Sequence, residues 1–238
     1  MRRRAALTRA GAGSRPAPGM QEAVMDADER TKREAIIAAC LEMNRSGLNQ
    51  GTSGNISVRH GEGLLITPTA IAYEKLAPED IVFLAMDGTA TGRHRPSSEW
   101  RFHRDILAAR PEAQAVVHAH PLACTTLAIL NREIPAIHYM IAAAGGPTIR
   151  VAPYAIYGSE ELSHHAVAAL DGRLACLLEH HGMIAIGPSL ARTLWTAVEV
   201  ETLARQYLGC LQLGEVRILS EAQIAAVIEK FSGYGLQV

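Results

Sequence analysis

The first regular pattern of apolar positions covers residues 28–46. Ile36, Cys40 and Met43 recur there at intervals of three and four residues, which places them on one face of a helix. Gly47 follows at once and supplies the backbone freedom that commonly ends a helix. The pattern therefore predicts an amphipathic helix with one face against a core.

The next hundred residues alternate short β-like runs with turn signals, and Pro111 ends the single helix predicted among them. Because strands and helices mix without strict β-α-β alternation, we do not expect a simply parallel sheet. The predicted strands are 54–58, 63–66, 81–86, 115–118, 174–180 and 183–186. The predicted helices are 28–46, 98–110, 159–170, 189–213 and one opened by a capping box of Ser220 and Gln223.

The chain begins with a different kind of segment. Residues 1–25 are rich in Arg, Ala, Gly and Pro and lack usable periodicity, which predicts a disordered extension. A transit-like peptide and a start codon placed too far upstream, with Met20 or Met25 as the true start, are alternatives. Residues 26–238 are expected to form one domain, since a chain of 238 residues more often forms one domain than two.

Composition narrows the class of protein. A charged fraction of 20% and a net charge of -1 give no electrostatic bias toward nucleic acid or membrane. No apolar run approaches the ~18–20 residues that span a bilayer. The four cysteines lie far apart without a CxxC pair, so they are read as reduced thiols of a cytoplasmic protein.

Histidines at the ends of two apolar runs are the first candidates for chemistry. His118 and His120 stand two apart on a predicted strand, so both project from one face. Open catalytic zinc sites typically use three protein ligands, and this pair could supply two. His180 and His181 close a second run before Gly182; neighbours on a strand point to opposite faces, so one of them could be the third ligand, and spacing leaves open which.

A third candidate opens the helix before the HxH strand. Ser97 and Ser98 offer two hydroxyls near the free amides of a helix start, which suits an anion such as phosphate. The alternative is a plain N-cap with Glu99 in an acidic first turn. Glu99 is close enough in sequence to share a pocket with the metal. The glycine-rich stretch 49–55 offers more backbone donors but lacks the Gly-Lys-Ser/Thr ending of a P-loop.

From about residue 31 onward the chain resembles the class II aldolase/adducin family, through seven motifs in the same order: GTSGNIS, LLITPT, PSSEWRFH, AVVHAH, IPAIHYMIAAAGG, APYAIYG and EHHGMIA. The resemblance implies a three-layer α/β/α sandwich around a largely antiparallel sheet. It also implies a C4 homotetramer with active sites at subunit interfaces. By the same resemblance, the ligands of one Zn²⁺ per subunit are His118, His120 and His181.

The resemblance assigns further roles. Glu99 would ligate the resting zinc and then carry the proton, Tyr139 would reach a neighbouring subunit's site, and Tyr234 would close over the substrate. Two positions depart from the family pattern: Ala70 replaces a glycine, and Tyr157 replaces a phenylalanine in the wall expected to face the aldehyde. The residues expected at the substrate phosphate are Asn55, Thr69, Ser97 and Ser98.

The activity implied is zinc-dependent cleavage of a ketose 1-phosphate of the L-fuculose 1-phosphate type to dihydroxyacetone phosphate and a small aldehyde. A 5-deoxyribulose or 5-methylthioribulose 1-phosphate substrate at the same site is the main alternative, followed by the family's epimerases and dehydratases and by a non-catalytic adducin-like interaction module. A Schiff-base aldolase would need a desolvated lysine. The candidates lie in polar or amphipathic surroundings and are Lys32, Lys75 and Lys230.

Overall fold

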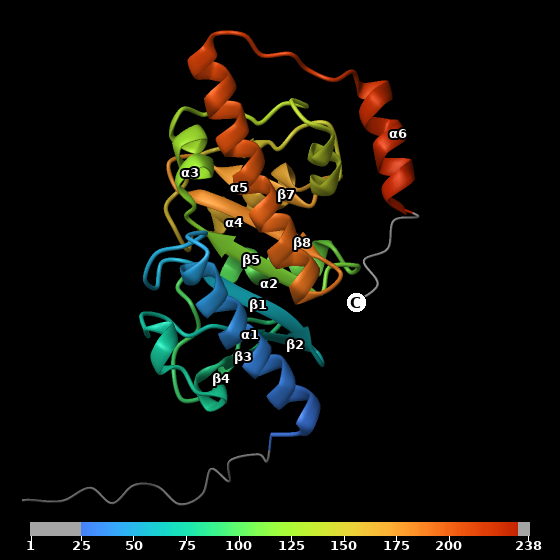
Figure 1. The fold of residues 1–238 in the computed structure, drawn as a ribbon. Helices are drawn as coiled ribbons and strands as arrows, with labels where there is room; N and C mark the ends of the chain where they lie inside the picture. Colours follow the sequence, from blue (N-terminus) through green and yellow to red (C-terminus); the bar gives the residue numbers. More distant parts are fainter. Residues whose placement is uncertain (1–24, 233–238) are drawn as a thin grey trace, which may run out of the picture.

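The computed structural model describes residues 25–232. The predicted extension at 1–25 lies outside these residues except for Met25, and Tyr234 lies outside them as well. The described chain forms one eight-stranded sheet in the order β4-β3-β2-β1-β5-β8-β7-β6 (Figure 1). The strands are β1 (Asn55–His60), β2 (Gly63–Ile66), β3 (Val82–Ala85), β4 (Ala90–Thr91), β5 (Ala115–Ala119), β6 (Val151–Ala152), β7 (Ala175–Leu178) and β8 (Gly182–Gly187).

Neighbouring strands are antiparallel except β6 and β7, which run parallel, so the prediction of a largely antiparallel sheet is confirmed. The central register pairs Asn55 of β1 with His118 of β5, and His118 in turn with Ile184 of β8. Directly paired residues project from the same face of a sheet. The middle of the sheet therefore places Asn55 beside His118.

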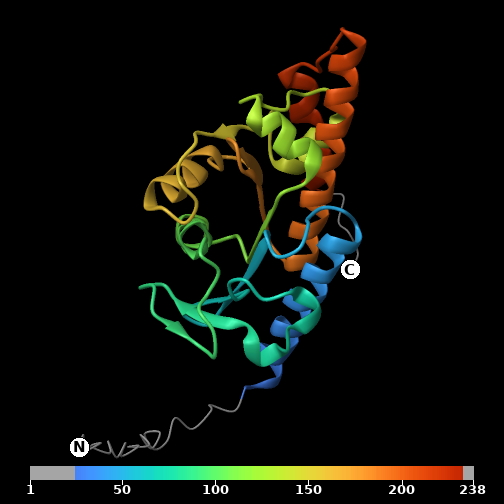
Figure 2. The ribbon, with the colours of Figure 1, turned by 90° about the vertical axis from the view of Figure 1, so that its left-hand side faces the viewer.

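Helices cover both faces of the sheet and complete three layers (Figure 2). On one face lie α1, α3 and α5, and on the other lie α2 and α4. The last helix, α6, packs against the 3-10 helix η3 (Tyr139–Ala144). None of the helices in residues 25–232 is long and apolar enough to cross a membrane. The helices are α1 (Ala27–Arg45), α2 (Trp100–Ala109), α3 (Leu122–Ile129), α4 (Glu160–Ala169), α5 (Leu190–Leu213) and α6 (Glu221–Ser232).

Strand β5 shows how alternation feeds two cores. Val117 is fully buried in the cluster under α1, α3 and α5, whereas Val116 is fully buried in the cluster under α2 and α4. His118 shares a face with Val116 and so lies on the α2/α4 side, where its ring meets the edge of Phe102. The imidazole of His118 is therefore packed against the core under α2 and α4.

Two of the helices differ from the sequence predictions. Helix α3 was not predicted, because its residues LACTTLAI are apolar on nearly every side and carry no helical period. Helix α2 begins at Trp100 rather than at residue 98. The reason is that Ser97 donates its amide hydrogen to the carbonyl of Thr67, and Pro68 bridges to Pro96, which holds the preceding segment in extended form.

Candidate active site

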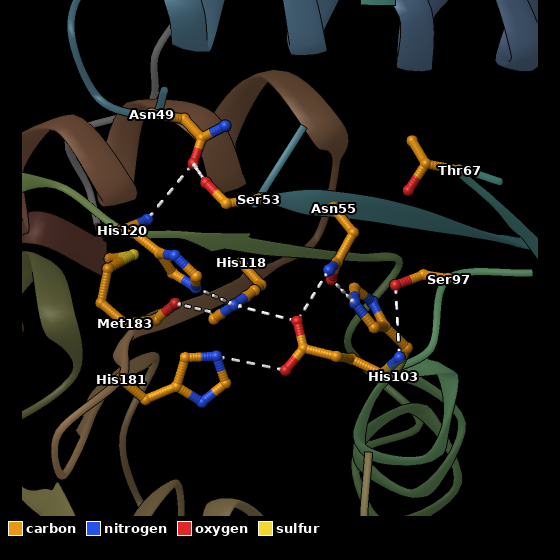
Figure 3. Close-up of polar contacts among 12 residues, drawn as sticks. Asn49, Ser53, Asn55, Thr67, Ser97, His103, His118, His120, His181 and Met183 are labelled. Carbon is orange, nitrogen blue, oxygen red and sulfur yellow. Dashed lines mark hydrogen bonds and ion pairs between the residues drawn. The ribbon is translucent and has the colours of Figure 1, made fainter. Parts of the chain in front are cut away.

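Three histidines converge at one end of the central strands (Figure 3). His118 and His120 project from the same face of β5, as predicted, with their Nε2 atoms 2.9 Å apart. His181 lies in the turn between β7 and β8, next to Gly182. A Cβ at Gly182 would come within 2.6 Å of the His120 ring, so glycine lets this turn approach β5 closely.

Glu99, the residue that directly precedes α2, completes the cluster. Its Oε2 lies 3.2 Å from Nε2 of His118, and its Oε1 lies 3.2 Å from Nε2 of His181. The ligand atoms of these three residues and His120 all lie within 4.8 Å of one another. Four groups from three separate parts of the chain thus face one small volume.

The hydrogen bonds around His118 settle which way its lone pair points. Its Nδ1 lies 2.9 Å from the carbonyl oxygen of Met183, which can only accept, so Nδ1 carries the hydrogen. In the neutral ring, Nε2 then directs a lone pair toward Glu99 and His120. Oε1 of Glu99 is buried and makes no hydrogen bond, although His181 lies beside it. A lone pair that faces a carboxylate and a buried carboxylate oxygen without a hydrogen bond would both be stabilised by a positive centre, and a divalent metal ion fits this set of donors.

The electrostatics of the cluster favour the forms that bind metal. Burial by itself would raise the pKa of Glu99, but its electrostatic interactions with His118 and His181 outweigh burial and hold that pKa well below its usual value. Burial, assisted by His118 and His181, lowers the pKa of His120 to about 3. An ionised carboxylate and a neutral imidazole result, and these are the protonation states of metal ligands.

A layer of polar groups lies behind Glu99. Nδ2 of Asn55 donates to Oε2 of Glu99 at 2.9 Å, and Oδ1 of Asn55 lies 2.5 Å from Nε2 of His103. Nδ1 of His103 lies 2.8 Å from the hydroxyl of Ser57. All of these side chains are buried. The sequence analysis did not single out His103, although its position four residues after Glu99 is a spacing that brings two side chains to one side of a helix.

The glycine-rich stretch 49–55 supports the cluster from the other side. Oδ1 of Asn49 accepts hydrogen bonds from the amide of His120 and the hydroxyl of Ser53. A Cβ at Gly54 would lie 2.7 Å from the carbonyl of His118 and 2.9 Å from Asn49. Glycine there allows the loop to pack directly onto β5.

A pocket of about 460 Å³ opens above the cluster. Its lining includes Glu99, His120 and His181, and every residue that the sequence analysis assigned to the phosphate or to the aldehyde wall. Pocket and cluster therefore share one site. The lining residues are Thr52, Ser53, Gly54, Asn55, Pro68, Thr69, Ala70, Ser97, Ser98, Glu99, His120, Tyr154, Ala155, Tyr157, His180 and His181.

The serine segment differs from an open helix start. The amides of Glu99 and Trp100 donate to the Oγ and carbonyl oxygen of Ser97, and the amide of Ser97 donates to Thr67. These backbone donors are already used within the chain. An anion here would instead meet the hydroxyl hydrogens of Ser97 and the exposed Ser98.

Ala70 occupies the pocket wall with a φ of 58°. This is the left-handed region, which costs a residue with a Cβ roughly 1–2 kcal/mol. The backbone at this position therefore keeps a conformation suited to glycine even though alanine occupies it. Tyr157, the other departure from the family pattern, lines the pocket with 64% of its surface exposed.

At the rim, Tyr154 was not singled out from the sequence, and His180 was named only as the alternative to His181 as a ligand. Tyr154 is fixed by its amide, which donates to Oε2 of Glu179 at 2.8 Å, and its ring meets the edge of His180. His180 has a φ of 55°, which turns its side chain away from the cluster that His181 joins. The EHH and APY motifs contained both residues, but sequence alone did not give their direction.

Tyr139 lies away from this pocket, on η3. Its ring packs beside His138, with Phe231 of α6 nearby, and about half of its surface is exposed. Its predicted contribution to a neighbouring subunit's site stays a prediction, and Tyr234 lies outside the described residues.

Comparison with known proteins agrees with this site. Residues 34–208 match the family described as Class II Aldolase and Adducin N-terminal domain, and the chain belongs to that family. It is 55% identical over 212 residues to L-fuculose phosphate aldolase of Escherichia coli K12, covering 88% of this chain and 99% of that one.

The chain is also similar to a second sequence relative and to a solved structure. The chain is 54% identical over 203 residues to 5-methylthioribulose-1-phosphate/5-deoxyribulose-1-phosphate aldolase of Rhodospirillum rubrum, covering 85% of this chain and 92% of that one. A solved L-fuculose 1-phosphate aldolase superposes with a TM-score of 0.83 at 35% identity, covering 87% of this chain and 97% of that structure.

Proposed function

We propose that this protein is a metal-dependent, class II aldolase that cleaves a ketose 1-phosphate to dihydroxyacetone phosphate and a small aldehyde. The observation that carries the proposal is the convergence of Glu99 with His118, His120 and His181 at the floor of a pocket lined by polar groups. A non-catalytic, adducin-like module would not need to retain all four of these groups in contact.

The chain's own residues divide the work. The hydroxyls of Ser97, Ser98 and Thr69 at one side of the pocket, with an Asn55 amide hydrogen, suit the phosphate. A metal ion bound by the three histidines supplies a Lewis acid for the negative charge that develops when the C3–C4 bond breaks. The electron pair of that bond stays with C3 as an enediolate, and the C4 hydroxyl passes its proton to the Glu99 carboxylate as the aldehyde forms.

Glu99 is the proton carrier at C3. It lies beside the ligand atoms and lines the pocket, so a carboxyl there reaches both the metal site and the substrate. Near a dication its basicity would be low, and release from the metal on substrate binding would bring its pKa closer to that needed for proton transfer. The acid form of Glu99 then protonates the enediolate, which yields dihydroxyacetone phosphate.

L-fuculose 1-phosphate is the proposed substrate, with lactaldehyde as the aldehyde product. It is supported by the relatives named for it at 55% and 35% identity. A 5-deoxyribulose or 5-methylthioribulose 1-phosphate is the second candidate, because a relative named for those compounds is 54% identical. Tyr154 and Tyr157 at the outer pocket would face the part of the sugar in which these substrates differ.

The proposal also covers the identity of the metal, the oligomeric state and the roles of two tyrosines. Zinc is the proposed metal, because three imidazoles and a carboxylate are typical zinc ligands. A cytoplasmic C4 homotetramer is the proposed state. In this tetramer, Tyr139 would donate a hydrogen bond from its phenol to the aldehyde oxygen at a neighbour's site, and Tyr234 would close over the substrate. Half exposure of Tyr139 supports its availability to a second chain. Light scattering that gave the mass of one chain would contradict this arrangement.

The test is release of dihydroxyacetone phosphate from L-fuculose 1-phosphate, 5-deoxyribulose 1-phosphate and 5-methylthioribulose 1-phosphate, each before and after chelation and after Zn²⁺ is restored. Release that a chelator abolishes and Zn²⁺ recovers would support the metal aldolase, and the ranking by kcat/KM would identify the aldehyde fragment. Failure to release it from all three, by protein shown to contain metal, would overturn the proposal.

A further inference from the structure

The buried side chains behind Glu99 form a hydrogen-bonded chain whose direction is forced. An ionised carboxylate only accepts hydrogen bonds, so the Asn55 atom that faces Glu99 must be the amide nitrogen. The amide oxygen therefore faces His103 and needs a donor, which makes Nε2 of His103 the protonated nitrogen. Nδ1 must then accept, and the hydroxyl of Ser57 is its donor.

We propose that His103 is a positioning residue for Glu99: with Ser57, it holds the Asn55 amide so that its nitrogen, and not its oxygen, faces the carboxylate. The inference rests on the proposed function in that Glu99 is taken as both metal ligand and proton carrier. It gives Asn55 a role in addition to the phosphate contact proposed above.

Burial makes the hydrogen bonds in this row of side chains hard to replace. His103 is fully buried, and its ring stacks on Phe102 with centroids 4.7 Å apart, which fixes the ring plane. Burial lowers its pKa to about 3, so the ring is neutral and keeps one donor and one acceptor at neutral pH. A buried amide whose oxygen lost this donor would carry an unsatisfied acceptor.

The consequence of losing His103 follows from the symmetry of an amide. Its two ends have the same shape, so only the hydrogen-bond partners distinguish them. Without Nε2–H of His103, the Asn55 side chain could rotate by half a turn. Its oxygen would then face the carboxylate oxygen of Glu99, and the repulsion would move Glu99 away from the histidines.

The experiment compares His103→Phe, His103→Gln, Asn55→Ala and the double variant His103→Phe/Asn55→Ala. Phenylalanine keeps the flat ring but removes both nitrogens, whereas glutamine keeps one donor and one acceptor. Affinity for Zn²⁺ is measured by competition with a chelating dye, and kcat and KM by release of dihydroxyacetone phosphate. We expect His103→Phe to lower the affinity for Zn²⁺ or the kcat by about 10-fold or more, as is typical of groups that orient metal ligands.

The expected pattern separates positioning from mere stability. His103→Gln should recover most of the loss, and adding His103→Phe to Asn55→Ala should have little further effect, since His103 acts through Asn55. Ser163→Ala is the matched control, because it removes a partly buried hydrogen bond from Ser163 of α4 to Asp105, which lies on the same helix as His103. It should lower the melting temperature but leave Zn²⁺ affinity and kcat unchanged.

The nitrogen shifts of His103 in the ¹⁵N-labelled full chain test the geometry independently of aldolase activity. We expect a neutral ring with hydrogen on Nε2. Hydrogen on Nδ1, full additivity of the two substitutions, or a loss of Zn²⁺ affinity in Ser163→Ala equal to that in His103→Phe would each overturn the inference. Absence of aldolase activity with an intact tautomer and coupled Zn²⁺ affinities would instead contradict the proposed function.

Discussion

The floor and the rim of the pocket are built differently. At the floor, His118 is fully buried, Glu99 is 5% exposed, and each is oriented by named hydrogen bonds. At the rim, Tyr154 and Tyr157 expose 57% and 64% of their surfaces. A packed floor defines a reaction geometry, whereas an exposed rim can change a side chain at little cost to the fold. We therefore expect reaction type and substrate choice to depend on different parts of the pocket.

The relatives show the same separation. A protein named for L-fuculose phosphate and one named for 5-methylthioribulose and 5-deoxyribulose phosphates are 55% and 54% identical to this chain. Overall identity cannot rank two substrates when it differs by so little. The rim is where the structure leaves room for side chains that could distinguish the two substrates.

The strongest test of the floor is Glu99→Gln. Removing the proton carrier should lower kcat by about 10³-fold, in the range of general acid–base catalysis, while three histidines still hold the metal. Measurement of dihydroxyacetone phosphate release is combined with metal analysis of the same sample. Loss of metal, with activity recovered by added Zn²⁺, would contradict the role assigned to Glu99.

Acid should weaken the metal-free floor. The pKa of His103 is about 3 when folded against 6.5 for an ordinary histidine, so between these values the unfolded chain binds a proton that the folded chain does not. The stability that this group contributes is complete above pH 6.5 and is lost as the pH falls. At pH 5 the loss should be about 2 kcal/mol of unfolding free energy.

Urea unfolding of chelator-treated protein at pH 7.5 and pH 5.0 measures this loss. The pH dependence should be shallower in His103→Phe and unchanged in Ser163→Ala. An equal pH dependence in wild type and His103→Phe would show that His103 is not the buried neutral group responsible.

At the rim, Ser98→Ala tests the proposed phosphate contact. Ser98 is exposed and lines the pocket, so its removal should spare the fold and the metal. A hydrogen bond to a charged group contributes about 1.5–3 kcal/mol, so KM should rise about 10-fold or more. The inhibition constant of inorganic phosphate should rise in proportion. An unchanged constant would remove Ser98 from the phosphate site.

The smallest effect concerns Ala70, whose positive φ strains the pocket wall. Ala70→Gly should raise the unfolding free energy by about 1 kcal/mol, because relief of strain exceeds the entropy that glycine adds to the unfolded chain. Ala72→Gly is the matched control: Ala72 has a φ of -61°, and glycine there should destabilise. Equal effects of the two substitutions would show that no strain is stored at Ala70.

The sequence predicted most regular elements because their signals are local. The predicted helices, the capping serines and the predicted strands each lie within a few residues of a helix or strand in the structure. Helix α3 has no polar face from which to read a period. The start of α2 depends on a bridge between Pro68 and Pro96, a contact between distant segments that local pattern does not contain.

The site shows the same division between local and distant information. Strand alternation placed His118 and His120 together, but the choice between His180 and His181 depended on the backbone of a turn, where His180 adopts a positive φ. His103 was overlooked because a lone histidine in an amphipathic helix carries no local signal of a role. Its role depends on Asn55, which reaches it through pairing of β1 with β5.

The positions of the proposed metal ligands along the chain have a consequence for folding. Glu99, the pair on β5 and His181 approach one another only after β5 has paired with β8 and α2 has packed against the sheet. An unfolded chain can offer a metal ion only local groups, such as the imidazole pair of His118 and His120 or that of His180 and His181. Metal affinity should therefore arise late, with the native topology, and a bound ion should raise the free energy of unfolding in proportion to the logarithm of its concentration.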